Sequence, residues 1–285
     1  MKRESIDIAI VGAGPAGIAA CLEAVRLGLS PLLVSEGPVG GLVHAARRLD
    51  NLPGYPGGIS GSEWARACEI QLSEARIPRL MSKVLAVAGK EKDFLITTSR
   101  EIVSAHAVVL AVGTRPRPFP VALPHGPFIR RDAAGLPSRL EGLRAAVVGS
   151  GEAAVDTALN LADRGAAVTL LSRAEAPRAC AALLGELSTS EVRVLAGTAV
   201  CRAAEDAGTV RLLQEDGGEW TGNLAVFCIG RESRIDEIRL DCPPGTRGIL
   251  TAGDMNRTTD RYVLPAMADG RAAAFSSFIS ITREA

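Results

Sequence analysis

Two segments of the chain repeat one pattern, and this repeat restricts the fold more than any other feature of the sequence. Residues 6–37 contain an apolar strand, a glycine-rich turn, an Ala/Leu-rich helix and a second apolar strand. Residues 143–178 follow the same order. A strand, a helix and a second strand in this order form a βαβ unit, in which the two strands are parallel. The sequence therefore predicts an α/β fold that contains two such units.

The glycine-rich turns indicate what the two units bind. The first glycine permits the turn, the second lets the backbone approach a pyrophosphate, and the third small residue lets helix and strand pack closely. The helix N-terminus adds amide donors and a positive dipole. The positions concerned are Gly12, Gly14, Pro15, Ala16 and Gly17 in the first copy, and Gly149, Gly151, Glu152, Ala153 and Ala154 in the second. Because each turn has its strands and helix in order, we expect two dinucleotide sites.

The residues after the second strand of each unit distinguish the two nucleotides. Glu36 ends the first copy, and a carboxylate there accepts both hydroxyls of an adenosine ribose, which suits FAD or NAD. The second copy offers Arg173 and Arg178 instead, which suit a 2′-phosphate. We therefore expect NADPH in the second site, with NADH as the alternative. The competing interpretation is that these arginines are only solvated surface.

A third element indicates that the first nucleotide is a flavin. Near the C-terminus a short strand ends at Gly253 and Asp254 and precedes a long Ala-rich helix. An aspartate there accepts hydrogen bonds from ribityl hydroxyls, and the helix points its first amides at the flavin ring. The sequence therefore predicts FAD in the first site, although Asp254 alone would equally suit a helix cap.

Charge and hydropathy argue against two classes of partner. The chain has 32 basic and 32 acidic residues, so no net charge favours nucleic acid. Lys2 and Arg3 precede an apolar run, but Glu4 and Asp7 interrupt the pattern of an export signal, and no stretch approaches the roughly 20 apolar residues of a membrane span. We expect a cytoplasmic protein that binds neither nucleic acid nor membrane.

The cysteines and histidines do not form a metal site in the sequence pattern. The six cysteines contain no C-x-x-C pair, and the three histidines do not cluster; no metal is therefore expected. Cys21 and Cys228 lie in apolar helix and strand patterns, where a buried, inert thiol is expected.

Taken together, several motifs resemble those of the low-molecular-weight thioredoxin reductases and related flavoproteins with two dinucleotide domains. They are GAGPAG, Glu36, GGLVHAARRLDNLPGYPGGISGSEW from residue 40, AVGT, GSGEAA, SRAEAPRA and TAGD, and they cover nearly the whole chain. The resemblance implies two Rossmann-like, three-layer ββα domains, with an NAD(P) domain (115–242) inserted into a split FAD domain (1–114 and 243–285). It also implies a homodimer.

The resemblance further assigns residues to the two cofactors. It places Gly40, Gly41 and Asn51 along the flavin, and it leaves Arg173 and Arg178 as two positions of an NADPH-type arginine motif. The remaining cofactor-binding positions that it implies are Leu42, Gly113, Gly230, Gly253, Tyr262 and Val263.

The sequence departs from the family pattern at the position of greatest chemical interest. The family carries C-x-x-C followed by Asp before the second glycine turn, whereas residues 132–135 here are Asp-Ala-Ala-Gly. The expected His of the arginine motif is Ser172, its second Arg is Ala174, and the Gln expected near the flavin is Tyr262. Asp132 is the candidate catalytic residue of this loop, as a proton donor or acceptor. The alternatives are that it caps a turn or pairs with Arg131.

Three functions remain open from the sequence. The first is an FAD-dependent NAD(P)H oxidoreductase without a dithiol relay, whose flavin passes electrons to a small molecule, a quinone, an electron carrier or a partner subunit. The second is a non-catalytic FAD-binding subunit or flavin sensor with a degenerate NAD(P) site. The third is a disulfide reductase that uses other thiols, although disulfide exchange needs an attacking thiolate beside a second sulfur.

Overall fold

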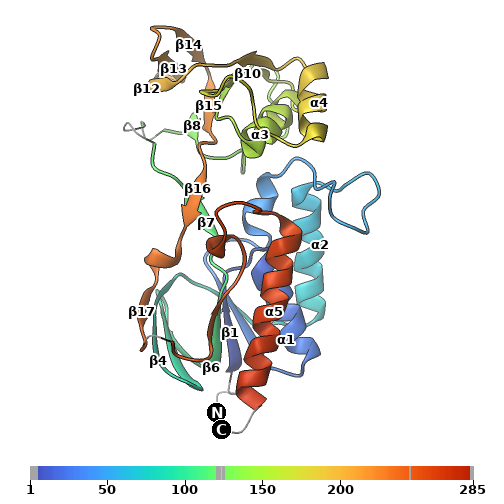
Figure 1. Ribbon diagram of the computed structural model, residues 1–285, viewed down its shortest axis with the longest axis vertical. Helices are drawn as coiled ribbons and strands as arrows, with labels where there is room; N and C mark the ends of the chain where they lie inside the picture. The colour runs from blue at the N-terminus through green and yellow to red at the C-terminus, as the bar shows by residue number, and fades with distance from the viewer. Residues whose placement is uncertain (1–5, 120–122, 124–125, 244, 283–285) are drawn as a thin grey trace. The chain divides into compact units, whose positions relative to one another are not determined.

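The computed structural model describes residues 6–119, 123, 126–243 and 245–282, so Lys2 and Arg3 lie outside the described residues. The chain forms two compact units (Figure 1). Unit 1 comprises Met1–His44, Arg48–Arg115 and Glu232–Ala285, and unit 2 comprises Pro116–Arg231 with the short segment Ala45–Arg47. Unit 2 is thus inserted into the chain of unit 1. The sequence placed the return to unit 1 at residue 243, whereas the compact unit resumes at Glu232.

Unit 1 is built on an eight-stranded sheet in the order β17-β4-β5-β6-β1-β2-β3, with β18 also paired to β6. Strands β1, β2, β3, β6 and β18 run parallel, while β4, β5 and β6 form an antiparallel meander. The strands are β1 (Ile6–Val11), β2 (Pro31–Ser35), β3 (Arg79–Met81), β4 (Val84–Lys90), β5 (Asp93–Thr98), β6 (Ile102–Leu110), β17 (Arg239–Asp241) and β18 (Ile249–Thr251).

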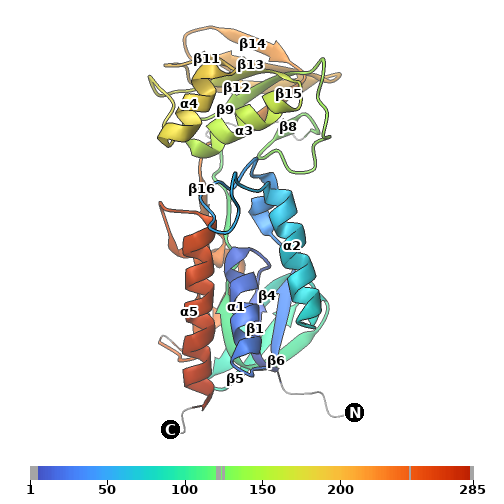
Figure 2. The ribbon, with the colours of Figure 1, turned by 90° about the vertical axis from the view of Figure 1, so that its right-hand side faces the viewer.

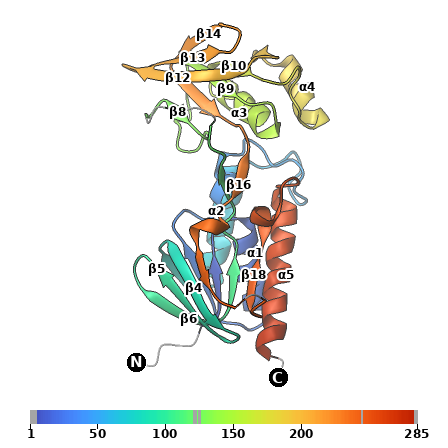
Figure 3. The same ribbon diagram turned by 60° about the vertical axis from the view of Figure 1, so that its left-hand side comes forward.

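Three helices cover the parallel strands of unit 1: α1 (Pro15–Arg26), α2 (Gly61–Glu74) and α5 (Val263–Thr282). Figure 2 shows the three helices in front of these strands, and Figure 3 shows the meander on the other side from α5. Helix α2 begins with a capping box, in which the Ser60 hydroxyl accepts from the Glu63 amide and the Glu63 carboxylate accepts from the Ser60 amide. The side chains of Ile8 and Ile10 on one face of β1 and of Ala9 on the other face are fully buried, as expected for a strand covered on both faces.

Unit 2 has a five-stranded parallel sheet, in the order β11-β10-β9-β15-β8, and a three-stranded antiparallel sheet, β12-β13-β14. The strands are β8 (Ile129–Arg130), β9 (Arg144–Val148), β10 (Ala167–Leu171), β11 (Arg193–Leu195), β12 (Val200–Asp206), β13 (Thr209–Gln214), β14 (Glu219–Gly222) and β15 (Leu224–Phe227), and the helices are α3 (Glu152–Asp163) and α4 (Ala181–Thr189). One buried cluster lies between α3 and the parallel sheet, and a second contains residues of both sheets.

Both predicted βαβ units are confirmed. The first comprises β1, α1 and β2, the second β9, α3 and β10, and in each the two strands pair in parallel. The chain leaves unit 1 along β7 (Thr114–Pro116) and returns along β16 (Arg231–Ser233), and these strands pair with each other. Short 3₁₀ turns are η1 (Gly41–Ala45), η2 (Ile235–Glu237) and η3 (Gly253–Asn256). Among the described residues, no helix combines the length and the apolar character that a membrane span requires.

Candidate functional site

The first glycine turn joins β1 to α1 in unit 1. Gly12 has a φ of +108°, and a Cβ there would lie 2.8 Å from the carbonyl carbon of Ala111, so glycine is required. Gly14 is the N-cap of α1, and a Cβ on Gly14 would meet no atom of the described residues within 4 Å. Pro15 opens the helix, where its missing N–H leaves no hydrogen bond unmade. The space beside the Gly14 Cα is therefore open, which suits the close approach of a pyrophosphate to the first amides of α1.

Segments far apart in the sequence meet at this helix N-terminus. The Gly40 amide donates to the Ala13 carbonyl at 2.8 Å. A Cβ on Gly41 would lie 3.4 Å from the Gly14 Cα. From the C-terminal part of the chain, a Cβ on Gly253 would lie 2.8 Å from the Ala16 Cβ. Three predicted cofactor segments are thus brought together within unit 1.

Asp254 follows directly, and its Oδ1 atom is buried. The turn that carries it is attached to α5, because the Asp269 carboxylate accepts from the Gly253 amide at 3.3 Å and binds Arg257 through two hydrogen bonds. Asp269 carries no motif of its own, so the sequence did not indicate it. The buried Asp254 oxygen would suit the ribityl hydroxyls of FAD, and the N-terminus of α1 would suit its pyrophosphate.

The other residues assigned to the flavin lie at or near the same unit 1 elements. Tyr262 directly precedes α5, with a largely exposed side chain, and Val263 begins the helix and is buried. Leu42 in η1 and Asn51 are exposed. Gly113 has a φ of +67°, and its carbonyl accepts from the Arg234 amide at 3.3 Å.

Glu36 directly follows β2, as expected, and its carboxylate is bound by an arginine that the sequence did not indicate. The Arg234 Nη2 atom donates to the Glu36 Oε1 atom at 2.5 Å, across 198 positions of sequence. No local pattern carries information about a pair so distant in the chain.

The second glycine turn joins β9 to α3 in unit 2 and repeats the geometry of the first. A Cβ on Gly149 would lie 2.9 Å from the Ala154 Cβ and 3.0 Å from the carbonyl carbon of Cys228. Gly151 is the N-cap of α3, and in the part of the chain that the structure describes a Cβ there would meet no atom within 4 Å. Ala153 follows in the first turn of α3, and Ala154 is fully buried. The space in front of α3 is therefore open as well.

The segment after β10, which carries Arg173 and Arg178, is hydrogen-bonded to this turn. The Arg178 amide donates to the Ser150 carbonyl at 2.5 Å, and the Cys180 amide donates to the Glu152 carboxylate at 2.9 Å. The resulting pocket has a volume of about 340 Å³ and is lined by Ser150, Gly151, Arg173, Ala174 and Arg178. Two predicted arginines and the second glycine thus share one pocket, which fits an anion at a helix N-terminus.

Ser172, which stands where the family pattern has a histidine, is fully buried. Its hydroxyl hydrogen-bonds with the Ser150 hydroxyl at 3.0 Å and the Ala174 carbonyl at 2.9 Å. It therefore connects the glycine turn, through Ser150, to the segment that carries Arg173 and Arg178.

Asp132 lies in the loop after β8, and its Oδ1 atom accepts a hydrogen bond from the Ala134 amide at 3.0 Å. The Arg130 side chain donates to the Ala134 carbonyl at 2.7 Å and closes the same turn. Arg131 instead carries a partly buried side chain, and this burial lowers the pKa of its guanidinium. Gly230 follows β15 with a φ of +99°, and its carbonyl accepts from the Arg117 amide.

Several cysteines are in surroundings that disfavour a thiolate. Burial raises the pKa of Cys68 and of Cys228 to about 11, and it raises the pKa of Cys21 further. Since the thiolate is the nucleophile in disulfide exchange, these three side chains are poor candidates for that chemistry.

Comparisons with known proteins agree with this geometry. Residues 6–264 match the family model of pyridine nucleotide-disulphide oxidoreductases. A ferredoxin--NADP reductase of Ignicoccus hospitalis is 27% identical over 95% of this chain and 97% of its own. A thioredoxin reductase of Treponema pallidum is 27% identical over 95% of each chain. The crystal structure of Lactococcus lactis thioredoxin reductase in the FR conformation superposes with a TM-score of 0.86 at 20% identity, covering 97% of this chain and 99% of that one. The fold is thus the two-domain Rossmann type predicted, and the chain belongs to the pyridine nucleotide-disulphide oxidoreductase family of oxidoreductases.

Proposed function

We propose that the protein is an FAD-dependent NADPH oxidoreductase that passes electrons to an acceptor other than a disulfide: a small molecule, a quinone or a protein electron carrier. The observation that carries this proposal is the pair of open glycine turns, one beside Glu36 and Asp254 and the other in a pocket with Arg173 and Arg178. FAD, when bound, supplies the chemistry, since flavins accept hydride from a reduced nicotinamide and pass electrons onward.

The residues of the chain have binding and orienting roles in this proposal. The first amides of α1 receive the FAD pyrophosphate, Glu36 the adenosine ribose and Asp254 the ribityl chain. In unit 2, the first amides of α3 receive the pyrophosphate of NADPH, and Arg173 and Arg178 bind its 2′-phosphate. NADH lacks that phosphate and would lose both charged contacts.

The acceptor is proposed from two considerations. Asp-Ala-Ala-Gly occupies the loop where the resembling reductases carry their dithiol, and burial raises the thiol pKa values of Cys21, Cys68 and Cys228. One relative with similarity along nearly the whole chain is named a ferredoxin--NADP reductase, which supports an electron carrier as acceptor. We propose a homodimer in the cytoplasm, as the sequence led us to expect.

The test starts with purified protein, its flavin spectrum, and anaerobic titration with NADPH and NADH. We expect bound FAD that NADPH bleaches at lower concentration than NADH, and turnover with quinones or a ferredoxin but not with thioredoxin. A flavin-free preparation that does not reconstitute would refute the cofactor. Bound flavin that neither nucleotide reduces would point to a non-catalytic flavin subunit, and robust thioredoxin turnover would point to a disulfide reductase.

One substitution and its control test whether the pocket of unit 2 prefers NADPH to NADH. Arg173→Ala should weaken NADPH binding by about 10- to 100-fold, the range for one charged hydrogen bond, with little effect on NADH. Arg211→Ala, an exposed arginine of β13 outside the pocket, is the matched control. Equal affinity for both nucleotides that Arg173→Ala leaves unchanged would contradict the assignment.

Asp132 stays a candidate proton donor or acceptor. Asp132→Asn retains an acceptor oxygen for the Ala134 amide and removes the charge, so the turn is preserved. A lower turnover number with a changed pH profile would support a proton-transfer role, whereas wild-type turnover would restrict Asp132 to closing the turn.

A further inference from the structure

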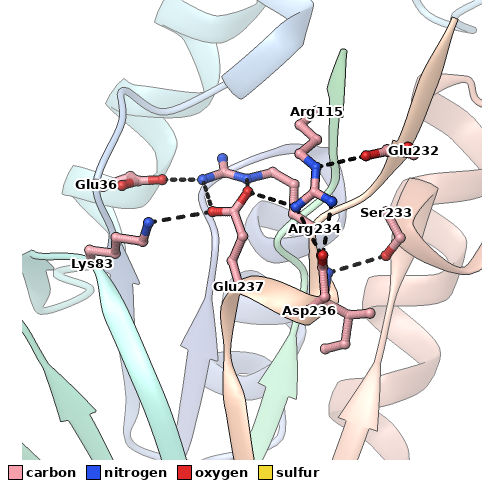
Figure 4. A network of polar contacts seen from close by, with 9 residues as sticks. Glu36, Lys83, Arg115, Glu232, Ser233, Arg234, Asp236 and Glu237 are labelled. Carbon is pink, nitrogen blue, oxygen red and sulfur yellow. Dashed lines mark hydrogen bonds and ion pairs between the residues drawn. The ribbon is translucent and has the colours of Figure 1, made fainter. Parts of the chain in front are cut away.

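Glu36, the carboxylate that we propose for the adenosine ribose, belongs to a larger polar network of unit 1 (Figure 4). The network joins the end of β2, the connection between β3 and β4, strand β7 and the segment on which the chain returns to unit 1. Its labelled members are Glu36, Lys83, Arg115, Glu232, Ser233, Arg234, Asp236 and Glu237. The end of β2 is thereby connected to a segment 198 positions away.

Arg234 is the cation at the centre of this arrangement, and Glu237 holds its guanidinium in one orientation. The Arg234 Nε and Nη2 atoms donate to the two Glu237 oxygens at 3.1 and 2.9 Å. Glu237 is in turn 3.5 Å from Lys83 Nζ and 3.5 Å from Arg115 Nη1. These charges, with the Arg234 hydrogen bond as the largest cause, lower the pKa of Glu237 to about 2. A two-point contact of this kind fixes a planar guanidinium in a way that a single contact does not.

The same Nη2 atom also reaches Glu36. It donates to Glu36 Oε1 at 2.5 Å, so the guanidinium lies between the carboxylates of Glu36 and Glu237 (Figure 4). Within the described part of the chain this is the one hydrogen bond that Glu36 makes, which leaves its Oε2 atom and the second lone pair of Oε1 to a ligand. The side chain of Glu36 is 44% exposed, and an exposed glutamate without such a partner would sample several rotamers.

We propose that Arg234 is a positioning residue for Glu36, and that it holds this carboxylate in the orientation that receives the two adjacent hydroxyls of an adenosine ribose. The inference rests on the proposed binding of FAD in unit 1. Two hydroxyls bound to one carboxylate require a defined orientation of that carboxylate. Fixing it before the ligand arrives removes part of the entropy lost on binding.

The test is a double-mutant cycle on the full chain, freed of flavin and titrated with FAD. Arg234→Gln removes the charge and the two-point contact and should weaken FAD binding by about tenfold, as one partly exposed charge-assisted hydrogen bond would. Glu36→Gln should also weaken it. In the Glu36→Gln background, adding Arg234→Gln should change the affinity by less than about twofold, because the group through which Arg234 acts is gone. A merely structural role of Arg234 would give the same loss in both backgrounds.

Two further variants complete the experiment. Arg239→Gln is the matched control, since Arg239 is an exposed arginine that pairs with Asp241 outside the network, and it should bind FAD as wild type does. Arg234→Lys keeps the charge without the two-point contact and should lie between wild type and Arg234→Gln; it decides the question if Arg234→Gln does not fold. Wild-type affinity in Arg234→Gln or in Arg234→Lys, or an undiminished loss in the Glu36→Gln background, would overturn the inference. A wild-type chain that does not take up FAD would instead overturn the proposed function.

Discussion

Gly270 in α5 offers a quantitative test of how unit 1 is assembled. A Cβ at this position would lie 2.6 Å from the carbonyl carbon and 2.9 Å from the Cα of Ala16, in the first turn of α1. Both atoms belong to the backbone, so no rotamer change relieves the overlap. The helices would have to separate by roughly 1 Å to restore ordinary contact distances. Overpacking of this kind costs about 1–3 kcal/mol, and occasionally more.

The net effect follows from comparing this cost with helix propensity. Alanine in a helix interior is more favourable than glycine by about 1 kcal/mol. Since rigid backbone atoms place the steric cost at the upper end of its range, we expect Gly270→Ala to lower the free energy of unfolding by about 2 kcal/mol. Gly185→Ala is the matched control, because Gly185 lies inside α4 and its added Cβ would have no neighbour within 4 Å among the residues that the structure describes. It should be stabilising by up to about 1 kcal/mol.

The two tryptophans let each unit be followed separately. Trp64 lies in unit 1 and Trp220 in unit 2, and both are buried. Urea unfolding of Gly270→Ala is therefore measured by fluorescence in a Trp220→Phe background, and that of Gly185→Ala in a Trp64→Phe background. An unfolding midpoint of Gly270→Ala equal to or above that of its parent would refute the close approach of α5 to α1.

Three further predictions concern single side chains. The pKa of Glu237 is about 2 in the folded chain against an ordinary 4.5, so its stabilisation is present above pH 4.5 and is lost as pH falls toward 2; urea titrations across this range should show a shallower decline of stability for Glu237→Gln than for wild type. In the folded protein at pH 8, an alkylating reagent should modify the exposed Cys180 well before the buried Cys21, as peptide mass spectrometry would show; equal rates would contradict the burial of Cys21. Ser172→Ala removes the hydroxyl that binds Ser150 and should destabilise unit 2 by about 1 kcal/mol and weaken NADPH binding severalfold; an unchanged NADPH affinity in isothermal titration calorimetry would show that this hydroxyl does not shape the pocket.

The parts of the structure that could be predicted from the sequence are those in which the information is local. Each glycine turn, with the strand before it and the helix after it, spans few residues. The same pattern of residues occurs twice in the chain. Arg173 and Arg178 lie within thirty residues of the turn that they join in unit 2, as the Arg178 and Ser150 backbone hydrogen bond shows. Their predicted proximity therefore needed only one βαβ unit to form.

The return of the chain to unit 1 was less accessible to prediction. The residues from Glu232 onward form β16, η2 and β17, each of which has three residues. Segments this short show no hydrophobic period. Strand β17 is also exposed along its length and joins the sheet at its edge, beside β4. Its membership of unit 1 depends on pairing with a strand from the first half of the chain, which no local pattern encodes.

The two glycine turns therefore differ in how their sites are completed, although their local geometry is the same. In unit 2 the turn, Ser172 and both arginines come from one continuous stretch, residues 149–178. In unit 1 the site draws on residues from beyond the inserted unit: Arg234 binds Glu36, and Gly253, whose amide donates to Asp269, approaches Ala16 in the first turn of α1. Closing so long a loop costs more chain entropy than closing a short one, and this cost comes before the non-local contacts can stabilise the chain. The unit 2 site can thus be shaped by its own βαβ unit, whereas the unit 1 site requires the chain after unit 2 to be in place. Substitutions at Arg234 or Gly270 should accordingly affect the proposed flavin site and leave the pocket at Arg173 and Arg178 in unit 2 intact.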